Sequence, residues 1–185
     1  MGNVFENCLQ PYKCIGAPRE PVVVMLGLDG VGKTATFLKL TNVRHGTTIP
    51  TIGFHVETIK FNYRKFTLWD IGGTDCLRPL WKNYLHANTD ALIFMVDASD
   101  RDRIVECAEE IQKVINNPNL NSIPILVLAN KQDLPNVMSS DEIVEKLGLK
   151  LFNNRYHIQE TSVYSHIELE RGINWLTNEI RAPRV

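Results

Sequence analysis

The sequence is poor in cysteine and has no long apolar run. The spacings of Cys8, Cys14, Cys76 and Cys107 match neither a disulfide framework nor a zinc site, which favours a reducing, cytosolic compartment. No stretch approaches the roughly 18 apolar residues of a transmembrane helix, and the N-terminus lacks the charged and apolar regions of a secretory signal. The sequence therefore predicts neither a membrane span nor a disulfide-stabilised secreted fold.

An excess of charge of either sign is also missing. The 20 basic and 21 acidic residues give a net charge of −1. Because nucleic-acid binding needs a basic face, we expect no nucleic-acid partner. The length of 185 residues fits one globular domain, which we expect to be a monomer.

The first twenty residues differ from the rest of the chain. Pro11, Pro18 and Pro21 punctuate this stretch as in a linker. Before the linker, apolar residues recur at helical spacing: Val4, Phe5, Cys8, Leu9 and Tyr12. We assign residues 1–20 to an N-terminal amphipathic helix and linker, and residues 21–185 to the globular domain.

In the globular domain, apolar runs typical of strands alternate with helical stripes. The expected strands are Val22–Leu26, Phe54–Phe61, Phe66–Trp69, Ala91–Val96, Ile125–Leu128 and Tyr156–Gln159. The expected helices are Lys33–Leu40, Ile104–Ile115, one that follows the capping box Ser139–Glu142, and one from Leu169 to Ile180. This alternation predicts an α/β fold with about six strands in a mostly parallel sheet and helices on both faces. A hairpin at Asn62–Arg64 predicts one antiparallel edge strand.

A glycine-rich motif lies between the first expected strand and helix. The motif G-x-x-x-x-G-K-[ST] is formed by Gly27, Leu28, Asp29, Gly30, Val31, Gly32, Lys33 and Thr34. Glycines let backbone N–H groups approach a polyphosphate, and a helix N-terminus favours an anion. We expect Lys33 to reach the outer phosphates and Thr34 to bind Mg²⁺. The strand and helix around the motif argue against a glycine-rich turn that binds nothing.

A second motif, Asn130-Lys131-Gln132-Asp133, follows the strand Ile125–Leu128. It falls at the sheet edge where open parallel sheets bind ligands. The Asp133 carboxylate can accept hydrogen bonds from N1 and N2 of guanine, and adenine offers no matching pair of donors. Taken alone, the motif could equally be a polar loop that follows a buried strand and binds nothing. Together with the phosphate-binding motif it predicts a site for GTP or GDP.

Two further segments indicate how a γ-phosphate would be sensed. Asp70 follows the strand Phe66–Trp69 and can hold the Mg²⁺ shell, and Gly73 can offer its backbone N–H to a γ-phosphate. The segment Thr48–Gly53 carries threonines that can bind Mg²⁺ when a γ-phosphate is present and leave it otherwise. Loops ordered in this way are the moving parts of a GTP switch.

These motifs together resemble the small GTPases, specifically the ADP-ribosylation factor and factor-like family. The resemblance rests on Gly27-Leu28-Asp29, Ile49–Phe54, Trp69–Gly73, Arg78-Pro79-Leu80-Trp81 and Leu128–Asp133, and it runs from about Gly2 to about Ile180. It implies the small G-domain variant of the P-loop fold. It also implies effector proteins, an exchange factor and a GTPase-activating protein as partners.

The resemblance assigns further roles by position. Thr51 would be the second protein ligand of Mg²⁺, and Ser162 and Val163 would lie in the third loop that contacts the guanine base. Phe54, Trp69 and Trp81 would form an exposed hydrophobic triad for effectors. By composition alone, these aromatic residues are more typical of core packing.

The sequence departs from the family directly after Gly73. The family has a glutamine there that orients the attacking water, whereas this chain has Thr74. We place Thr74 and Lys33 at the catalytic centre and expect a GTP hydrolase with very slow intrinsic activity. Alternatively, a partner supplies the missing chemistry in trans.

The N-terminus suggests a membrane anchor. Met1-Gly2-Asn3 resembles the N-myristoylated start of the family, although Glu6 replaces the usual serine or threonine at the sixth position. A single acyl chain binds membranes weakly, so the amphipathic helix would supply a second contact. The expected location is cytoplasmic, with reversible attachment to the Golgi or another endomembrane.

The motifs favour a GTP-binding molecular switch that recruits effectors to membranes in vesicle or protein trafficking. Thr74 favours a second hypothesis, that the protein is a GTP-loaded binding module with little or no catalysis. A kinase or ATPase with the same phosphate loop is disfavoured by Asn130–Asp133.

Overall fold

The computed structural model of the protein describes residues 19–41, 51, 53–152 and 155–180. The expected N-terminal helix and Gly2 lie outside these residues, so the domain boundary near residue 20 stays a prediction.

Six strands form one sheet, in the order β2-β3-β1-β4-β5-β6. They are β1 (Val22–Leu26), β2 (Phe54–Phe61), β3 (Arg64–Ile71), β4 (Thr89–Asp97), β5 (Ile125–Asn130) and β6 (Tyr156–Glu160). All neighbouring strands are parallel except β2 and β3, so the prediction of a mostly parallel sheet with an antiparallel edge strand is confirmed. The small G-domain fold follows from this order and from the helices that connect the strands.

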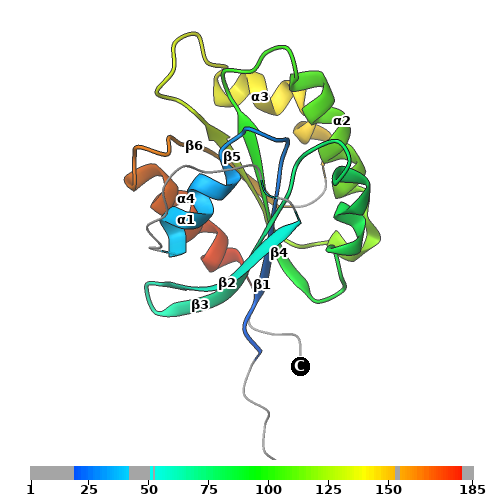
Figure 1. The fold of residues 1–185 in the computed structure, drawn as a ribbon, viewed down its shortest axis with the longest axis vertical. Coiled ribbons are helices and arrows are strands. Elements are labelled where there is room, and N and C mark those ends of the chain that lie inside the picture. Colours follow the sequence, from blue (N-terminus) through cyan, green and yellow to red (C-terminus); the bar gives the residue numbers. More distant parts are fainter. Residues whose placement is uncertain (1–18, 42–50, 52, 153–154, 181–185) are drawn as a thin grey trace, which may run out of the picture.

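The helices cover both faces of the sheet. They are α1 (Lys33–Thr41), α2 (Ile104–Ile115), α3 (Ser140–Lys146) and α4 (Ile167–Glu179), with 3-10 turns η1 (Arg78–Asn83), η2 (Pro118–Leu120) and η3 (Leu149–Leu151). Figure 1 shows α1 and α4 on one side of the sheet, and α2 and α3 on the other. None of the helices within the described residues has the length and apolarity needed to cross a membrane.

The central strands are buried because helices cover both of their faces. All six residues of β5 are buried, as are the last four of β1. Strands buried on both faces read as continuous apolar runs, which is why these segments were recognisable in the sequence. Their carboxyl ends lie side by side, since Met25 is in register with Asp70, and Asp97 with Asn130. The residues that follow these strands therefore meet at one edge of the sheet.

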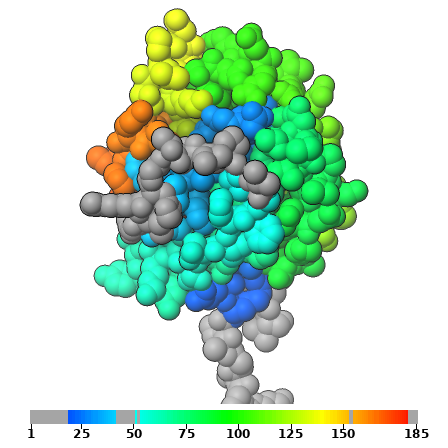
Figure 2. All heavy atoms as spheres, in the orientation of Figure 1, coloured from blue at the N-terminus to red at the C-terminus, as the bar shows by residue number. Residues whose placement is uncertain are grey.

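The β2–β3 hairpin lies at one end of the sheet and is largely exposed on the β2 side. Its turn is Asn62-Tyr63, because Arg64 already pairs with Phe61. Asn62 has a φ of 52°, a conformation that asparagine tolerates better than most residues. In Figure 2 the hairpin (cyan) forms part of the surface of the drawn face.

Candidate functional site

The glycine-rich loop between β1 and α1 has the backbone conformation that its glycines allow. Gly27, Gly30 and Gly32 all have positive φ, at 144°, 73° and 99°. A Cβ on Gly27 would lie 2.4 Å from the carbonyl oxygen of Met95, and one on Gly32 would lie 2.4 Å from Nδ2 of Asn130. A side chain at Gly27 would collide with the backbone of β4, and one at Gly32 would displace the Asn130 side chain and strain the loop at its positive φ. Glycine is therefore favoured at both positions.

Lys33, the first residue of α1, reaches back over this loop. Its Nζ donates hydrogen bonds to the carbonyl oxygens of Gly27 (2.8 Å) and Leu28 (2.7 Å). Burial lowers the pKa of Lys33 to about 8, against the opposing effect of the Asp70 and Asp29 carboxylates. A buried ammonium group at the mouth of an anion-binding loop is suited to bind a phosphate.

Ten residues line a pocket in front of the loop, with a volume of about 150 Å³. They are Asp29, Gly30, Gly32, Lys33, Thr34, Ala35, Thr51, Gly72, Gly73 and Thr74. The pocket therefore joins the phosphate motif with the segment after β3, as the sequence predicts.

Three oxygen-bearing side chains meet at one side of this pocket. The Thr34 hydroxyl lies 2.8 Å from the Thr51 hydroxyl and 3.1 Å from Oδ2 of Asp70. Asp70 is fully buried, its Oδ1 has no hydrogen-bond partner among the described residues, and burial raises its pKa. Two hydroxyls beside a buried carboxylate with an unpaired oxygen fit Mg²⁺, which prefers oxygen ligands. Thr34 and Thr51 would bind the ion, and Asp70 would hold its outer shell.

Gly73 packs directly against the phosphate loop. A Cβ at Gly73 would lie 2.2 Å from the carbonyl oxygen of Gly27 and 2.6 Å from Nζ of Lys33. At the adjacent Gly72, the N–H donates to Gly53 (2.9 Å) and the carbonyl accepts from Nε1 of Trp81 (2.9 Å). Because the Gly72 N–H is already paired, the Gly73 N–H is the group of this segment that can face a terminal phosphate.

The Asn130–Asp133 motif begins at the last residue of β5 and contacts the phosphate loop at Val31. The Asn130 side chain donates to the carbonyl of Val31 (2.8 Å), and Lys131 pairs with Asp97 (2.6 Å). Asp133 is exposed and accepts a hydrogen bond of 2.5 Å from the Ser162 hydroxyl.

A lysine of α1 stabilises the loop that contains Ser162 and Val163. The ammonium of Lys39 donates to the carbonyls of Val163 (2.8 Å) and Ser165 (2.7 Å). The structure thus brings the two segments expected to contact the base next to one another, and Lys39 is a supporting residue that the sequence alone did not reveal.

Comparison with known proteins identifies the family. The sequence model of the ADP-ribosylation factor family matches residues 8–180. The chain belongs to this family. Its members are small GTPases that act as molecular switches and bind guanine nucleotide with Mg²⁺. A similar solved structure is the Arl6 (BBS3) small GTPase from Trypanosoma brucei with bound nucleotide analogue GppNp, with 31% identity and a TM-score of 0.78 over 86% of this chain and 96% of that chain.

In this Arf-family protein the prediction of an exposed aromatic triad is wrong for Trp81. Trp81 is 2% exposed, and its ring packs edge-on against Phe94 at 6.4 Å. It is therefore a core residue, and its burial leaves no face for an effector in this structure.

Tyr84 takes the place expected for Trp81. The Phe54 ring lies 5.4 Å from that of Trp69 and 5.6 Å from that of Tyr84, and 49% of Phe54 is exposed. A sequence signal existed, because Leu77, Trp81 and Leu85 recur every four residues and mark a buried face from which Tyr84 is excluded.

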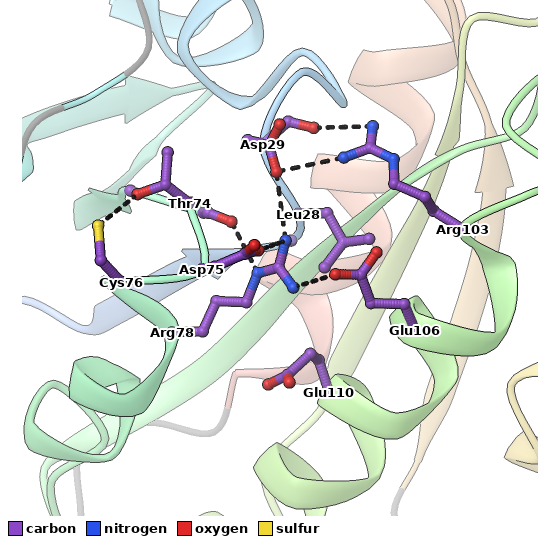
Figure 3. Close-up of polar contacts among 12 residues, drawn as sticks. Leu28, Asp29, Thr74, Asp75, Cys76, Arg78, Arg103, Glu106 and Glu110 are labelled. Carbon is purple, nitrogen blue, oxygen red and sulfur yellow. Dashed lines mark hydrogen bonds and ion pairs between the residues drawn. The ribbon is translucent and has the colours of Figure 1, made fainter.

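Thr74 lines the pocket beside Gly73, as expected for the position that replaces the family's glutamine. Its hydroxyl lies 3.4 Å from Sγ of Cys76, an exposed cysteine (Figure 3). A short side chain engaged in this way has no second polar end with which to hold a water molecule.

Proposed function

We propose that this Arf-family protein is a GTP-binding switch with very slow intrinsic hydrolysis. The proposal rests on the meeting of Lys33, Thr34 and Thr51 around one pocket, with the buried Asp70 bonded to Thr34. These groups suit a polyphosphate and Mg²⁺. The Asn130–Asp133 motif and Ser162–Val163 would select guanine.

In the hydrolysis step, the nucleotide would supply the γ-phosphoryl group and Mg²⁺ would neutralise charge on its oxygens. Lys33 would hold the outer phosphates, and the Gly73 N–H would donate to the γ-phosphate. Thr74 is poorly suited to orient the attacking water, because it is shorter than glutamine and has one polar end. Loss of such positioning slows a reaction by on the order of 10² to 10³.

A glutamine restored at position 74 tests the slow hydrolysis. Thr74→Gln is expected to raise single-turnover GTP hydrolysis by on the order of 10². Thr74→Asn is the matched control, because it adds an amide that is too short to reach. If Thr74→Gln hydrolyses GTP no faster than the parent, with and without a GTPase-activating protein, Thr74 is not the cause.

A second candidate function is a GTP-loaded binding module without turnover, and Thr74 is the observation that favours it. Chromatography of the nucleotide released from freshly purified protein separates the two. GDP would support the cycling switch, and GTP would support the binding module.

Effector and membrane binding complete the proposal. The exposed ring of Phe54, with the half-buried rings of Trp69 and Tyr84, would contact effector proteins. An acyl group on Gly2 with the N-terminal helix would bind membranes in a trafficking pathway. An intact mass without an acyl group, together with no liposome binding in the GTP-loaded form, would reject the membrane part.

A further inference from the structure

Arg78, the first residue of η1, forms an ion-pair centre behind the phosphate loop. Its side chain is 7% exposed, and its Nε donates to the carbonyl oxygen of Gly73 (2.8 Å). Its two terminal nitrogens pair with Asp75 (2.7 Å), Glu106 (2.5 Å) and Asp29 (3.2 Å). Figure 3 shows this guanidinium between the loop, the segment after β3 and helix α2. A single side chain thus links three parts of the chain that are distant in sequence.

Asp29 is an unusual neighbour for a phosphate, because it places a carboxylate inside an anion-binding loop and lines the pocket. Its charge is balanced by two guanidinium groups, those of Arg78 and Arg103, each 3.2 Å from Oδ1. Arg103 directly precedes α2 and is itself held by Asp100 at 2.7 Å. One of the two partners of Asp29 therefore lies at the start of helix α2, and the other lies in η1, directly after the segment that carries Gly73.

Because Arg78 and Arg103 lie in different segments, a movement of the Gly73 segment would affect only Arg78. Arg78 reaches Asp29 while Gly73 is packed on the loop, because the same guanidinium binds the Gly73 carbonyl and the Asp29 carboxylate. If the segment moved away, Asp29 would lose one of its two cations and the loop would become less favourable for an anion. Arg103 would stay in place.

We propose that the Arg78–Asp29 pair is a positioning device that favours triphosphate over diphosphate, by holding Gly73 on the loop and balancing the Asp29 charge in that arrangement. The inference rests on the proposed guanine-nucleotide binding and deepens it. Neither residue needs to touch the nucleotide for this role.

The test is a double-mutant cycle on nucleotide preference. The dissociation constants of GDP and of the non-hydrolysable analogue GppNp are measured with Mg²⁺ for the parent, Arg78→Gln, Asp29→Asn and the double variant. Each single variant is expected to lower the preference for GppNp over GDP by about tenfold. The double variant should lose no more than the larger single loss, because both remove the same contact. Removing the Asp29 charge should tighten GDP more than GppNp, because that charge lacks the Arg78 partner only when the segment is away from the loop. This effect also lowers the preference for GppNp.

Two arginine variants serve as comparisons. Arg103→Gln removes the other cation of Asp29 and is expected to weaken both nucleotides equally, which leaves the ratio unchanged. Arg101→Gln is the matched control, because Arg101 pairs with Glu142 on an exposed surface and should change neither affinity.

An unchanged ratio in Arg78→Gln and Asp29→Asn, or a double variant whose loss is the product of the single losses, overturns the inference. If Arg78→Gln does not fold, the Asp29→Asn ratio decides, since 41% of that side chain is exposed and its loss leaves the core intact. A parent that binds neither GDP nor GppNp instead overturns the proposed nucleotide binding itself.

Discussion

Trp81 and Tyr84 are three residues apart, yet the structure gives them opposite environments. Trp81 is buried against Phe94 and donates to the Gly72 carbonyl, whereas Tyr84 lies half-buried beside Phe54 and Trp69. The resemblance to the family located the right region but selected the wrong aromatic residue in it. A residue type alone does not reveal which face of a short helical turn it occupies.

This contrast predicts unequal stability losses. Trp81→Ala removes a large buried ring together with its hydrogen bond, so the free energy of unfolding should fall by about 3 to 5 kcal/mol. Tyr84→Ala removes a half-buried ring and should cost about 1 kcal/mol. Urea unfolding of both variants measures the difference. Equal losses would mean that Trp81 is not a core residue in solution.

The site was more predictable than the aromatic cluster because its motifs carry their geometry in short stretches of sequence. Gly27–Thr34 follows β1 and Asp70–Gly73 begins at the end of β3, and parallel strands bring their carboxyl ends to one edge. The support of Asp29 by Arg78 and Arg103 was not predictable, because these contacts join residues that are distant in sequence. Lys39 was missed for the same reason.

At the level of elements, the limits of two strands were predicted correctly, those of the buried β1 and of the exposed edge strand β2. The expected limits of Val22–Leu26 and Phe54–Phe61 agree with the structure, whereas β3 extends beyond the expected Phe66–Trp69 to Arg64–Ile71. The ends of β3 carry charged or polar residues that an apolar run does not include. The 3-10 turns η2 and η3 were not predicted, because a single turn of three residues is too short for a repeating apolar stripe.

The capping box of α3 gives a prediction at this scale. Ser139 is the N-cap, and its hydroxyl accepts a hydrogen bond from the N–H of Glu142 at 3.2 Å. Ser139→Ala should lower the free energy of unfolding by about 1 kcal/mol, while Ser139→Asp keeps the cap and should change it little. Chemical denaturation of the two variants provides the measurement. An equal loss in both would show that the cap contributes nothing.

For the whole molecule, nucleotide binding should appear as stability. The pocket lies between the phosphate loop and the segment after β3, so a ligand there joins parts of the fold that otherwise meet through Gly73 and Arg78. GDP with Mg²⁺ at a thousand times its dissociation constant should add about 4 kcal/mol. For a chain of this size, that corresponds to a rise in melting temperature of about 8 to 16 °C.

Thermal unfolding of nucleotide-free protein measures this rise, with ADP at the same concentration as the control. EDTA added to the GDP-bound form should reverse part of the rise, because Mg²⁺ is part of the bound complex. Equal stabilisation by ADP would contradict the selection of guanine by Asn130–Asp133.

The central position of β1 in the sheet affects how the chain folds during synthesis. The first strand of the described fold lies between β3 and β4, in the middle of the sheet. During synthesis, a chain that has emerged as far as Ile71 can form β1, β2 and β3 but leaves the other edge of β1 open. That edge, in the apolar run Val22–Leu26, is covered when Thr89–Asp97 leaves the ribosome, and unpaired strand edges attract other chains. Between these two points, the nascent chain is exposed to aggregation along this edge of β1.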